Sequence, residues 1–505
     1  EAQRTVSEAR WSWKRSIKLG AAGIALIGCV VLAFLLIPNR LRDRVLKRQG
    51  AIRSLAVLPF ENLSGDPSKD YFADGFTDEL TTDLAEQTRI LVVSRTSVMR
   101  YKGSRKPLPE IARELKVDAI VEGSVMLSDQ QVHITAQLIQ ASTDRHLWAH
   151  SYDRDRKDFF PIQSEVAATI AGLIRANTMT RNATGVSSPQ FTRETYELYL
   201  ECRGLARQSS EEDQNLAIKC YEHVLTLDPK CAPAYAGIAD SNSALGLDHV
   251  PRARAAAMKA VELDPSLAEA HDALGSVKMT YDKDLVEAER EFKEALALNP
   301  SYAVGHLDYA LLLVGTGRFT DAIAEAKTAR ELDPFSAGNV MSSGMILFMT
   351  GRYDEAIEEE RAALELDPQH DRAHYWAGYA YEQKRMYDKA IAEYEKVLDP
   401  DDHGIFLTAL GRSHLLAGDS KEAEEMRHRA ESLSGDNFLW PYDAALLYTS
   451  LGDRDRAFVW LEKDLAQHDG WLLLLNIDPR LDPLRSDPRF RDLVKRVGLP
   501  VSESR

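Results

Sequence analysis

The feature that most constrains this chain is a short pattern that returns about every 34 residues between Tyr196 and about Gly470. An Asp-Pro or Asn-Pro pair closes six amphipathic runs, with the prolines at positions 229, 265, 300, 334, 368 and 400. Successive prolines lie 36, 35, 34, 34 and 32 residues apart. Each period holds two helical patterns, and the proline ends the second because it cannot continue a helix. This spacing predicts an array of stacked helix pairs.

Small and aromatic residues recur at matching places in successive periods. In the fourth unit they are Gly317, Phe319, Ala322, Ala326, Ala329 and Pro334, and in the fifth Gly344, Gly351, Tyr353, Ala356, Ala363 and Pro368. Two further units, around Gly418 and Gly452, lack the closing proline, which gives about eight repeats over residues 195–470. One helix pair cannot bury its apolar face alone, so we expect an all-α solenoid, a right-handed superhelix with a concave surface.

The spacing and the small residues resemble tetratricopeptide (TPR) repeats over more than half of the chain. The resemblance implies a protein-binding scaffold and does not imply catalysis. It also implies that the concave face is built mainly from the first helix of each repeat. The Lys and Asn pattern of carboxylate-clamp TPRs is not evident, so we do not expect binding of chaperone tails.

The predicted partner-binding groove lies on the first helices of the fifth and sixth units. The positions that commonly line the concave face are Met341, Met345, Phe348, Tyr375 and Tyr379. A stripe of Met and aromatic side chains suits an apolar peptide in extended or helical form. The alternative is that these side chains pack between adjacent repeats, and the sequence leaves both open.

A run of 19 residues without a charge, 19–37, predicts a single transmembrane helix. At 1.5 Å per residue it spans roughly 28 Å, close to a hydrocarbon core of about 30 Å. Trp11 and Trp13 lie where interfacial aromatics are found. A secretory signal is the alternative, but no small-residue cleavage site follows. Basic segments lie on both sides, at 1–18 and 38–53, so the positive-inside rule does not fix the orientation.

The net charge of -16 is unevenly distributed. Residues 1–53 hold eleven Lys and Arg against three acids, about +8, so the remainder carries about -24. An acidic soluble part argues against general nucleic-acid binding in these residues. Because the chain opens on Glu1 in a charged segment, we expect part of the protein to be missing upstream.

Residues 54–175 read as a compact α/β module. Predicted strands lie at 54–60, 90–94, 119–127, 133–142 and 146–153, and predicted helices at 71–86, 108–115 and 160–174. The third and fourth strands form a hairpin near Gln130. A linker at 176–194 leads into the repeats, and residues 471–505 are expected to cap the open end of the solenoid.

The module resembles the domain labelled TolB amino-terminal-like, over about 110 residues. The resemblance rests on LAVLPFENLSGDPSKDYFADGFTDELTTDL, VVSRTSVMRYKG, ARELKVDAIVEGSV and VHITAQLIQASTDRHLWAHSYDR. In bacterial membrane proteins of this layout, similar domains lie between a transmembrane helix and TPRs, outside the cytoplasmic membrane. Such proteins commonly carry an upstream cytoplasmic effector: a DNA-binding domain as in CadC-like regulators, a class III cyclase or a kinase.

Several residues of the module invite a functional interpretation. Asp74, Asp78 and Glu79 could form an acidic mouth, but acids in a first helical turn also complement the helix dipole, which we favour. Gly65 and Gly75 are expected to serve turns. Arg95, Tyr101 and Lys102 fit a ligand surface and a solvated strand edge equally well. Trp148 with Tyr152 reads as core or edge packing.

No phosphate-cradling loop, zinc spacing or nucleophile elbow appears, so we expect no catalytic, cofactor or metal site. His271, His306 and His374 recur at one position of their repeats, which indicates packing. Four cysteines are too few for a disulfide scaffold. The preferred interpretation of Cys202, Cys220 and Cys231 is buried thiols, and a bridge would join the first two.

These observations predict the membrane-anchored sensory or protein-interaction part of a bacterial signalling or transcriptional regulator. A partner binds the solenoid, and the signal passes to a cytoplasmic effector absent from this chain. We place the protein in the cytoplasmic membrane with its soluble part outside the cytoplasm, in one or more copies. The alternatives are a non-signalling scaffold for envelope complexes and a protein whose missing part is an enzyme.

Overall fold

A computed structural model describes residues 52–88, 90–128, 130–155, 159–177, 193–206, 211–245, 249–397, 404–432, 441–467 and 470–499. The predicted membrane span 19–37 lies outside these residues. Among the helices in this part of the chain, none is long and apolar enough to cross a membrane. The module and the repeats belong to one compact unit.

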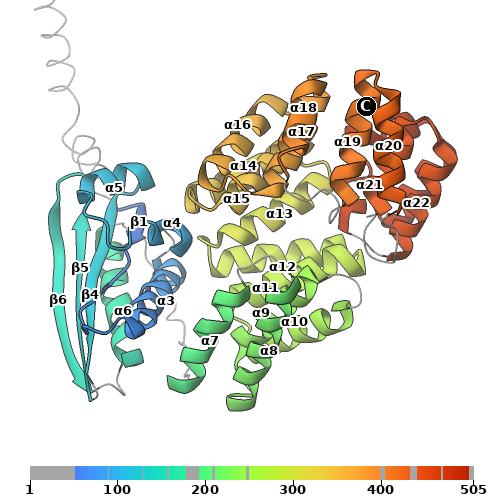
Figure 1. The fold of residues 1–505 in the computed structure, drawn as a ribbon. Coiled ribbons are helices and arrows are strands. Elements are labelled where there is room, and N and C mark those ends of the chain that lie inside the picture. Colours follow the sequence, from blue (N-terminus) through green and yellow to red (C-terminus); the bar gives the residue numbers. More distant parts are fainter. Residues whose placement is uncertain are drawn as a thin grey trace, which may run out of the picture. The chain divides into compact units, whose positions relative to one another are not determined.

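The module is built on a mixed sheet (Figure 1). Its strands are β1 (Ser54–Val57), β2 (Glu61–Asn62), β3 (Leu91–Val92), β4 (Ala119–Leu127), β5 (Gln131–Gln140) and β6 (Arg145–Asp155). The order is β3-β1-β4-β5-β6, and β2 pairs with β4. Strand β1 runs parallel to β3 and β4, whereas β4, β5 and β6 are antiparallel. The predicted hairpin of the third and fourth strands is therefore confirmed.

Helices α3 (Asp70–Thr88), α4 (Arg95–Met99), α5 (Leu108–Leu115) and α6 (Phe159–Asn177) complete the module. Helices α4 and α5 pack on the sheet through a core that includes Ala56, Ile111 and Ile120. The sequence missed α4, a single short turn capped by Ser94, whose side chain accepts from the Ser97 amide. A strand edge was one of two interpretations of Arg95, Tyr101 and Lys102, and it is wrong for Arg95, which lies in this helix.

The predicted role of the acids at the start of α3 was also wrong. The helix begins at Asp70, so Asp74, Asp78 and Glu79 lie beyond its first turn and do not complement the dipole there. Gly75 lies inside the helix rather than in a turn, whereas Gly65 adopts a φ of +72°. A 3-10 turn, η1 (Pro67–Lys69), leads directly into the helix.

Eight helix pairs follow the module in the described residues (Figure 1). They are α7 (Arg193–Ala206) with α8 (Glu211–Leu227), α9 (Ala232–Ala244) with α10 (Val250–Leu263), α11 (Ala268–Val277) with α12 (Leu285–Leu298), α13 (Ala303–Gly315) with α14 (Phe319–Leu332), α15 (Ala337–Met349) with α16 (Tyr353–Leu366), α17 (Asp371–Gln383) with α18 (Tyr387–Tyr394), α19 (Gly404–Ala417) with α20 (Ser420–Ser432), and α21 (Pro441–Ser450) with α22 (Arg454–Gln467). The repeat period thus gives both the number and the type of these elements.

The small residues of the repeat lie where paired helices touch. A Cβ on Gly378 would come within 2.3 Å of the Tyr394 ring, and a Cβ on Gly237 within 2.4 Å of the Tyr221 ring. The glycines between paired helices serve turns, as Gly317 and Gly351 show with φ of +79° and +82°. The pattern is therefore steric: one glycine makes room for an aromatic ring and another permits the reversal.

The recurring histidines join the two helices of one repeat. Nδ1 of His271 lies 2.6 Å from a Glu291 carboxylate oxygen, and Nδ1 of His374 lies 2.8 Å from Glu393. His306 makes the equivalent contact with Glu325. Among the described residues, no group of three or more His, Cys, Asp or Glu is placed to hold a metal ion. The three His–Glu contacts agree with the packing role that the periodicity indicated.

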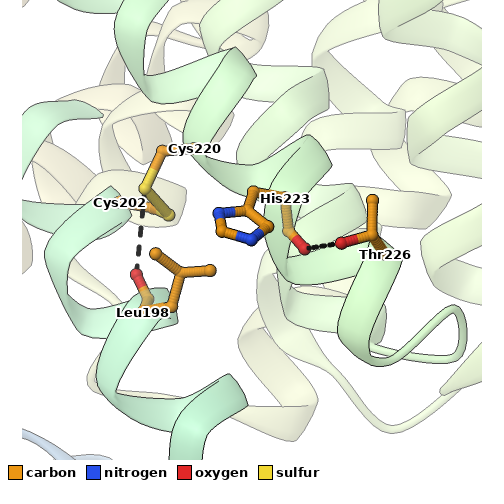
Figure 2. The surroundings of a disulfide bond; sticks show 5 residues. All are labelled: Leu198, Cys202, Cys220, His223 and Thr226. Atoms are coloured by element: carbon orange, nitrogen blue, oxygen red, sulfur yellow. Dashed lines mark hydrogen bonds between the residues drawn. A yellow bond between two sulfur atoms is a disulfide. The ribbon is translucent and has the colours of Figure 1, made fainter.

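A disulfide joins the first helix pair (Figure 2). It links Cys202 on α7 to Cys220 on α8, with their Cα atoms 5.3 Å apart, whereas Cys231 is a buried free thiol. The sequence analysis named Cys202 and Cys220 as the pair that a bridge would join, and this is the pair that the structure joins. The preferred interpretation, buried thiols, was wrong for two of them, because these two helices face each other at that point.

Candidate binding cleft

The five predicted groove residues lie together, but they are not open to solvent. Phe348 and Tyr379 are 1% exposed, and Met341, Met345 and Tyr375 are also buried. The Tyr379 hydroxyl lies 2.8 Å from the Tyr375 hydroxyl and 3.0 Å from an Asp443 carboxylate oxygen, which the Tyr375 hydroxyl also contacts. These contacts agree with the packing alternative, and binding of a peptide at these residues stays a prediction.

The C-terminal segment of the chain covers this groove. It contains η5 (Gly470–Leu474), η6 (Pro479–Leu484) and α23 (Pro488–Val497). Arg480 lies with its guanidinium carbon 3.9 Å from the centroid of the Tyr379 ring, and Trp471 contacts Trp376 at 5.8 Å between rings. Leu473 lies against Gly315 of α13, in the fourth repeat. The expected cap therefore lies along the first helices of several repeats, where a bound peptide was predicted.

The other part of the concave surface faces the module. Loops that end the third and fourth repeats dock on the edge formed by β3 and α4. Ser301 Oγ accepts from the Val92 amide at 3.0 Å, and Ser97 Oγ donates to Asp333 at 2.5 Å. The amide of Phe335 donates to Ser97 Oγ at 2.9 Å. Ser97 and Asp333 are buried, so this contact is a closed polar network that positions the module against the repeats.

A cavity of about 700 Å³ lies between the module and the first helices of the early repeats. Its module wall is formed by α3 and α4, including Asp78, Thr81, Arg95 and Thr96. Its repeat wall comes mainly from α7, α9 and the starts of α11, α13 and α15, including Tyr199, Arg203, Asp240, Ser241, Glu269 and Tyr302. This volume is in the range of ligand-binding pockets.

One ion-pair cluster occupies the module side of the cavity. The Asp78 carboxylate lies 3.1 Å from Arg203 of α7 and 3.9 Å from Arg95 of α4. Burial lowers the pKa of Arg203, but the attraction of nearby negative charges, chiefly Asp78, outweighs it and raises that pKa. Both arginines thus contact Asp78 of the module. The ion pair between Asp78 and Arg203 joins α3 to the first repeat.

The opposite wall carries acids with no comparable cation. Desolvation, followed by the charges of Asp308 and Glu269, raises the pKa of Asp240 to about 8. Desolvation also raises the pKa of Glu269, although Arg203 opposes the shift. Behind them, burial and then Asp308 raise the pKa of Asp272. Asp240 keeps contact with solvent, so the repeat wall presents acidic groups at an accessible surface.

Two polar atoms in this wall have no hydrogen-bond partner among the described residues: Ser241 Oγ and Glu269 Oε2. Ser241 is 1% exposed and lines the cavity. A buried hydroxyl without a partner costs free energy, so it marks a place where a ligand or water would complete the site.

Of the residues considered earlier in the module, Asp78 and Arg95 reach the cavity. Lys102 pairs with Asp74 at 2.8 Å, and the Tyr101 hydroxyl donates to Glu114 at 2.7 Å. Tyr152 is buried in the sheet. These contacts are structural.

Sequence analysis missed Arg203, Asp240 and Glu269. The available signal was that helices α9, α11 and α13 contain acids but no Lys or Arg. A pattern of acids without nearby cations on successive first helices indicates an acidic inner surface. That the module would face this surface could not be seen in the sequence.

Residues 281–337, 307–371 and 343–405 match the tetratricopeptide repeat family. Over 245 residues the chain is 33% identical to a protein of Rhizobium meliloti named "Putative adenylate cyclase 3", a match that covers 47% of this chain and 42% of that protein. The chain thus spans less than half the length of this relative.

Solved structures with similar regions include MamA, at 26% identity and a TM-score of 0.27 over 31% of this chain and 93% of MamA. The pilF protein of Pseudomonas aeruginosa is 21% identical, with a TM-score of 0.33 over 43% of this chain and 98% of pilF. A chain of the Cut9-Hcn1 assembly is 15% identical, with a TM-score of 0.42 over 59% of this chain and 52% of that chain. The matched residues, 281–405, are tetratricopeptide repeats, and the chain shares a homologous region with part of the cyclase-named relative.

Proposed function

We propose that this chain is the membrane-anchored sensory and protein-interaction portion of a bacterial signalling protein. The region shared with the cyclase-named relative carries the proposal, because the chain matches only 42% of that protein and the relative has a further part. In this proposal residues 19–37 form the anchor and the repeats bind a protein partner. The effector is an upstream cytoplasmic domain of the class III cyclase type, and the residues of this chain perform no catalysis.

The disulfide supports a position outside the cytoplasm. Bridges such as Cys202–Cys220 persist in oxidising compartments and are rare in the reducing cytosol. The TolB-like character of the module points to the same side of the membrane. We therefore propose that residues 54–505 lie outside the cytoplasmic membrane.

The contact between module and repeats provides a route for coupling. Ser97 and Asp333 are 236 residues apart in the sequence and join a module helix to a repeat loop. A partner that favours one arrangement of the repeats therefore also acts on the module, which is next to the proposed anchor. A ligand shifts such an equilibrium only by its difference in affinity for the two states.

Topology is the first test. A reporter that is active only outside the cytoplasmic membrane is fused after Arg505 of the full chain, and a cytoplasmic reporter is fused at the same place as the matched control. We expect activity only from the first fusion. The opposite result contradicts the sensor and favours a tethered cytoplasmic scaffold.

The second test concerns the effector. The complete coding sequence is expressed, and cyclic nucleotide formation is measured in membranes for the natural protein and for Ser97→Ala. We expect cyclase activity that changes when the module contact is weakened. A complete protein without nucleotide-cyclising activity contradicts the cyclase assignment, and a complete protein with no effector domain favours the scaffold alternative.

A further inference from the structure

We propose that the cavity between the module and the early repeats binds a basic peptide segment, with a Lys or Arg side chain of the partner directed at Glu269 and Asp240. The proposal deepens the proposed protein-binding function and rests on it. It locates the partner site in the open cleft rather than in the groove that the C-terminal segment covers.

The first step is the availability of the surface. The C-terminal segment buries the first helices of the middle and later repeats, where Phe348 and Tyr379 are 1% exposed. By contrast, the first helices α9, α11 and α13 contribute to the wall of a cavity of about 700 Å³. The cavity is larger than one side chain requires, so it has room for a short segment of a partner.

The second step is the charge of that wall. Asp240 and Glu269 line the cavity, and Asp272 and Asp308 lie behind them. All four acids come from helices that contain no Lys or Arg. Arg203 attracts Glu269, but its strongest attraction is to Asp78. A carboxylate in a partly desolvated wall is stabilised when a cation is brought beside it.

The third step is the presence of incomplete polar groups. Ser241 Oγ is buried in the wall, and neither it nor Glu269 Oε2 has a hydrogen-bond partner among the described residues. An ammonium or guanidinium group has several N–H donors and no acceptor, which matches a hydroxyl oxygen and a carboxylate oxygen.

The fourth step explains how a long basic side chain reaches these atoms. The small residues Ala236, Gly237 and Ala303 line the cavity together with the aromatic residues Tyr221 and Tyr302. The aliphatic stem of Lys or Arg packs on such apolar surface while its charged end remains near polar groups. Aromatic side chains at the same wall add favourable contact with the cation.

The test uses the full chain and a fluorescein-labelled peptide, Gly-Arg-Gly-Lys-Gly. Binding is measured by fluorescence anisotropy at low salt. The neutral comparison peptide has citrulline and norleucine in place of Arg and Lys. We expect at least tenfold tighter binding of the basic peptide, and at least a tenfold loss in the double variant Asp240→Asn, Glu269→Gln.

The matched control removes two negative charges elsewhere. Glu358 and Glu365 are exposed on α16, so the variant Glu358→Gln, Glu365→Gln has the same net charge change outside the cavity. It is expected to bind within about twofold of the natural chain. If the two double variants lose affinity equally, the attraction is a property of the whole acidic surface, and the cavity assignment is overturned.

A small free cation distinguishes a site for basic peptides from a site for small cations. n-Butylguanidinium is titrated as a competitor, and we expect it to compete at least a hundredfold more weakly than the unlabelled peptide. Equal competition would make the cavity a small-cation site and overturn the peptide assignment. Thermal unfolding of each variant verifies folding. The reporter and cyclase experiments use no peptide, so a failure here is distinguishable from a failure of the proposed function.

Discussion

Arg480 stacks on Tyr379, with its guanidinium carbon 3.9 Å from the ring centroid, and it forms a salt bridge of 2.6 Å with Asp478. Arg480 and Asp478 are both buried, and Asp478 also accepts from the Tyr442 hydroxyl at 2.9 Å. The pair thus ties the C-terminal segment to the first helices of the sixth and eighth repeats. The concave surface is closed here by the same chain that forms it.

We predict that Arg480→Ala destabilises the protein strongly. Removing one partner of a buried ion pair leaves the other charge uncompensated, at a cost of about 3 to 5 kcal/mol. The free energy of unfolding is measured with urea. The control is Arg496→Ala, which breaks a half-exposed ion pair with Glu462 and should cost about 1 kcal/mol or less. Equal losses would show that the buried pair does not hold the segment.

A second prediction concerns the close approach of Gly315 to Leu473. A Cβ on Gly315 would lie 2.4 Å from Leu473 Cγ, and Leu473 is itself buried. Gly315→Ala therefore forces the C-terminal segment to shift and should cost about 1 to 3 kcal/mol. In urea unfolding, the double variant with Leu473→Ala should lose less than the sum of the single losses.

Gly338→Ala is the matched control for that experiment. Gly338 also lies in a first helix, α15, but nothing lies within 4 Å of a Cβ built on it. Alanine is the better helix former, so this change is expected to be neutral or to stabilise by up to about 1 kcal/mol. A loss comparable to that of Gly315→Ala would mean that contact with Leu473 is not the cause.

The sequence predicts local order well and long-range contacts poorly. Gly378 and Tyr394 are part of a repeating pattern, so the helix pair that they join could be anticipated. Ser97 and Asp333 are 236 residues apart, and no periodicity indicates that a module helix meets a repeat loop. The same is true of Leu473 and Gly315. The groove was therefore predicted at residues that the chain itself covers, and the cavity acids were overlooked.

Reduction of the disulfide should lower stability. The bridge closes a loop with a sequence separation of 18, for which chain entropy gives about 3 kcal/mol. Thermal unfolding with and without reductant measures the effect, and Cys202→Ala, Cys220→Ala should not respond to reductant. If the natural chain melts at the same temperature in both conditions, the bridge contributes nothing to stability.

The last prediction concerns pH and Glu79, which faces the first repeat from α3. Burial raises its pKa to about 8; Arg203 of α7 opposes the shift, whereas Asp78, Asp83 and Glu269 add to it. The native pKa lies above the unfolded value of about 4.3, so the bound proton stabilises the fold. This contribution is fully present below about pH 4.3 and is lost as the pH rises through about 8.

Glu79→Gln keeps the side chain neutral at every pH. Its gain in unfolding free energy over the natural chain should be near zero at pH 4, grow up to about pH 8, and reach about 1 kcal/mol or more. Urea unfolding at pH 4, 6 and 8 measures this gain. The control is Glu365→Gln at an exposed position, whose effect on the unfolding free energy should not change with pH. A gain that does not change with pH would show that Glu79 has the same pKa in the native and unfolded states, because Arg203 compensates for its burial.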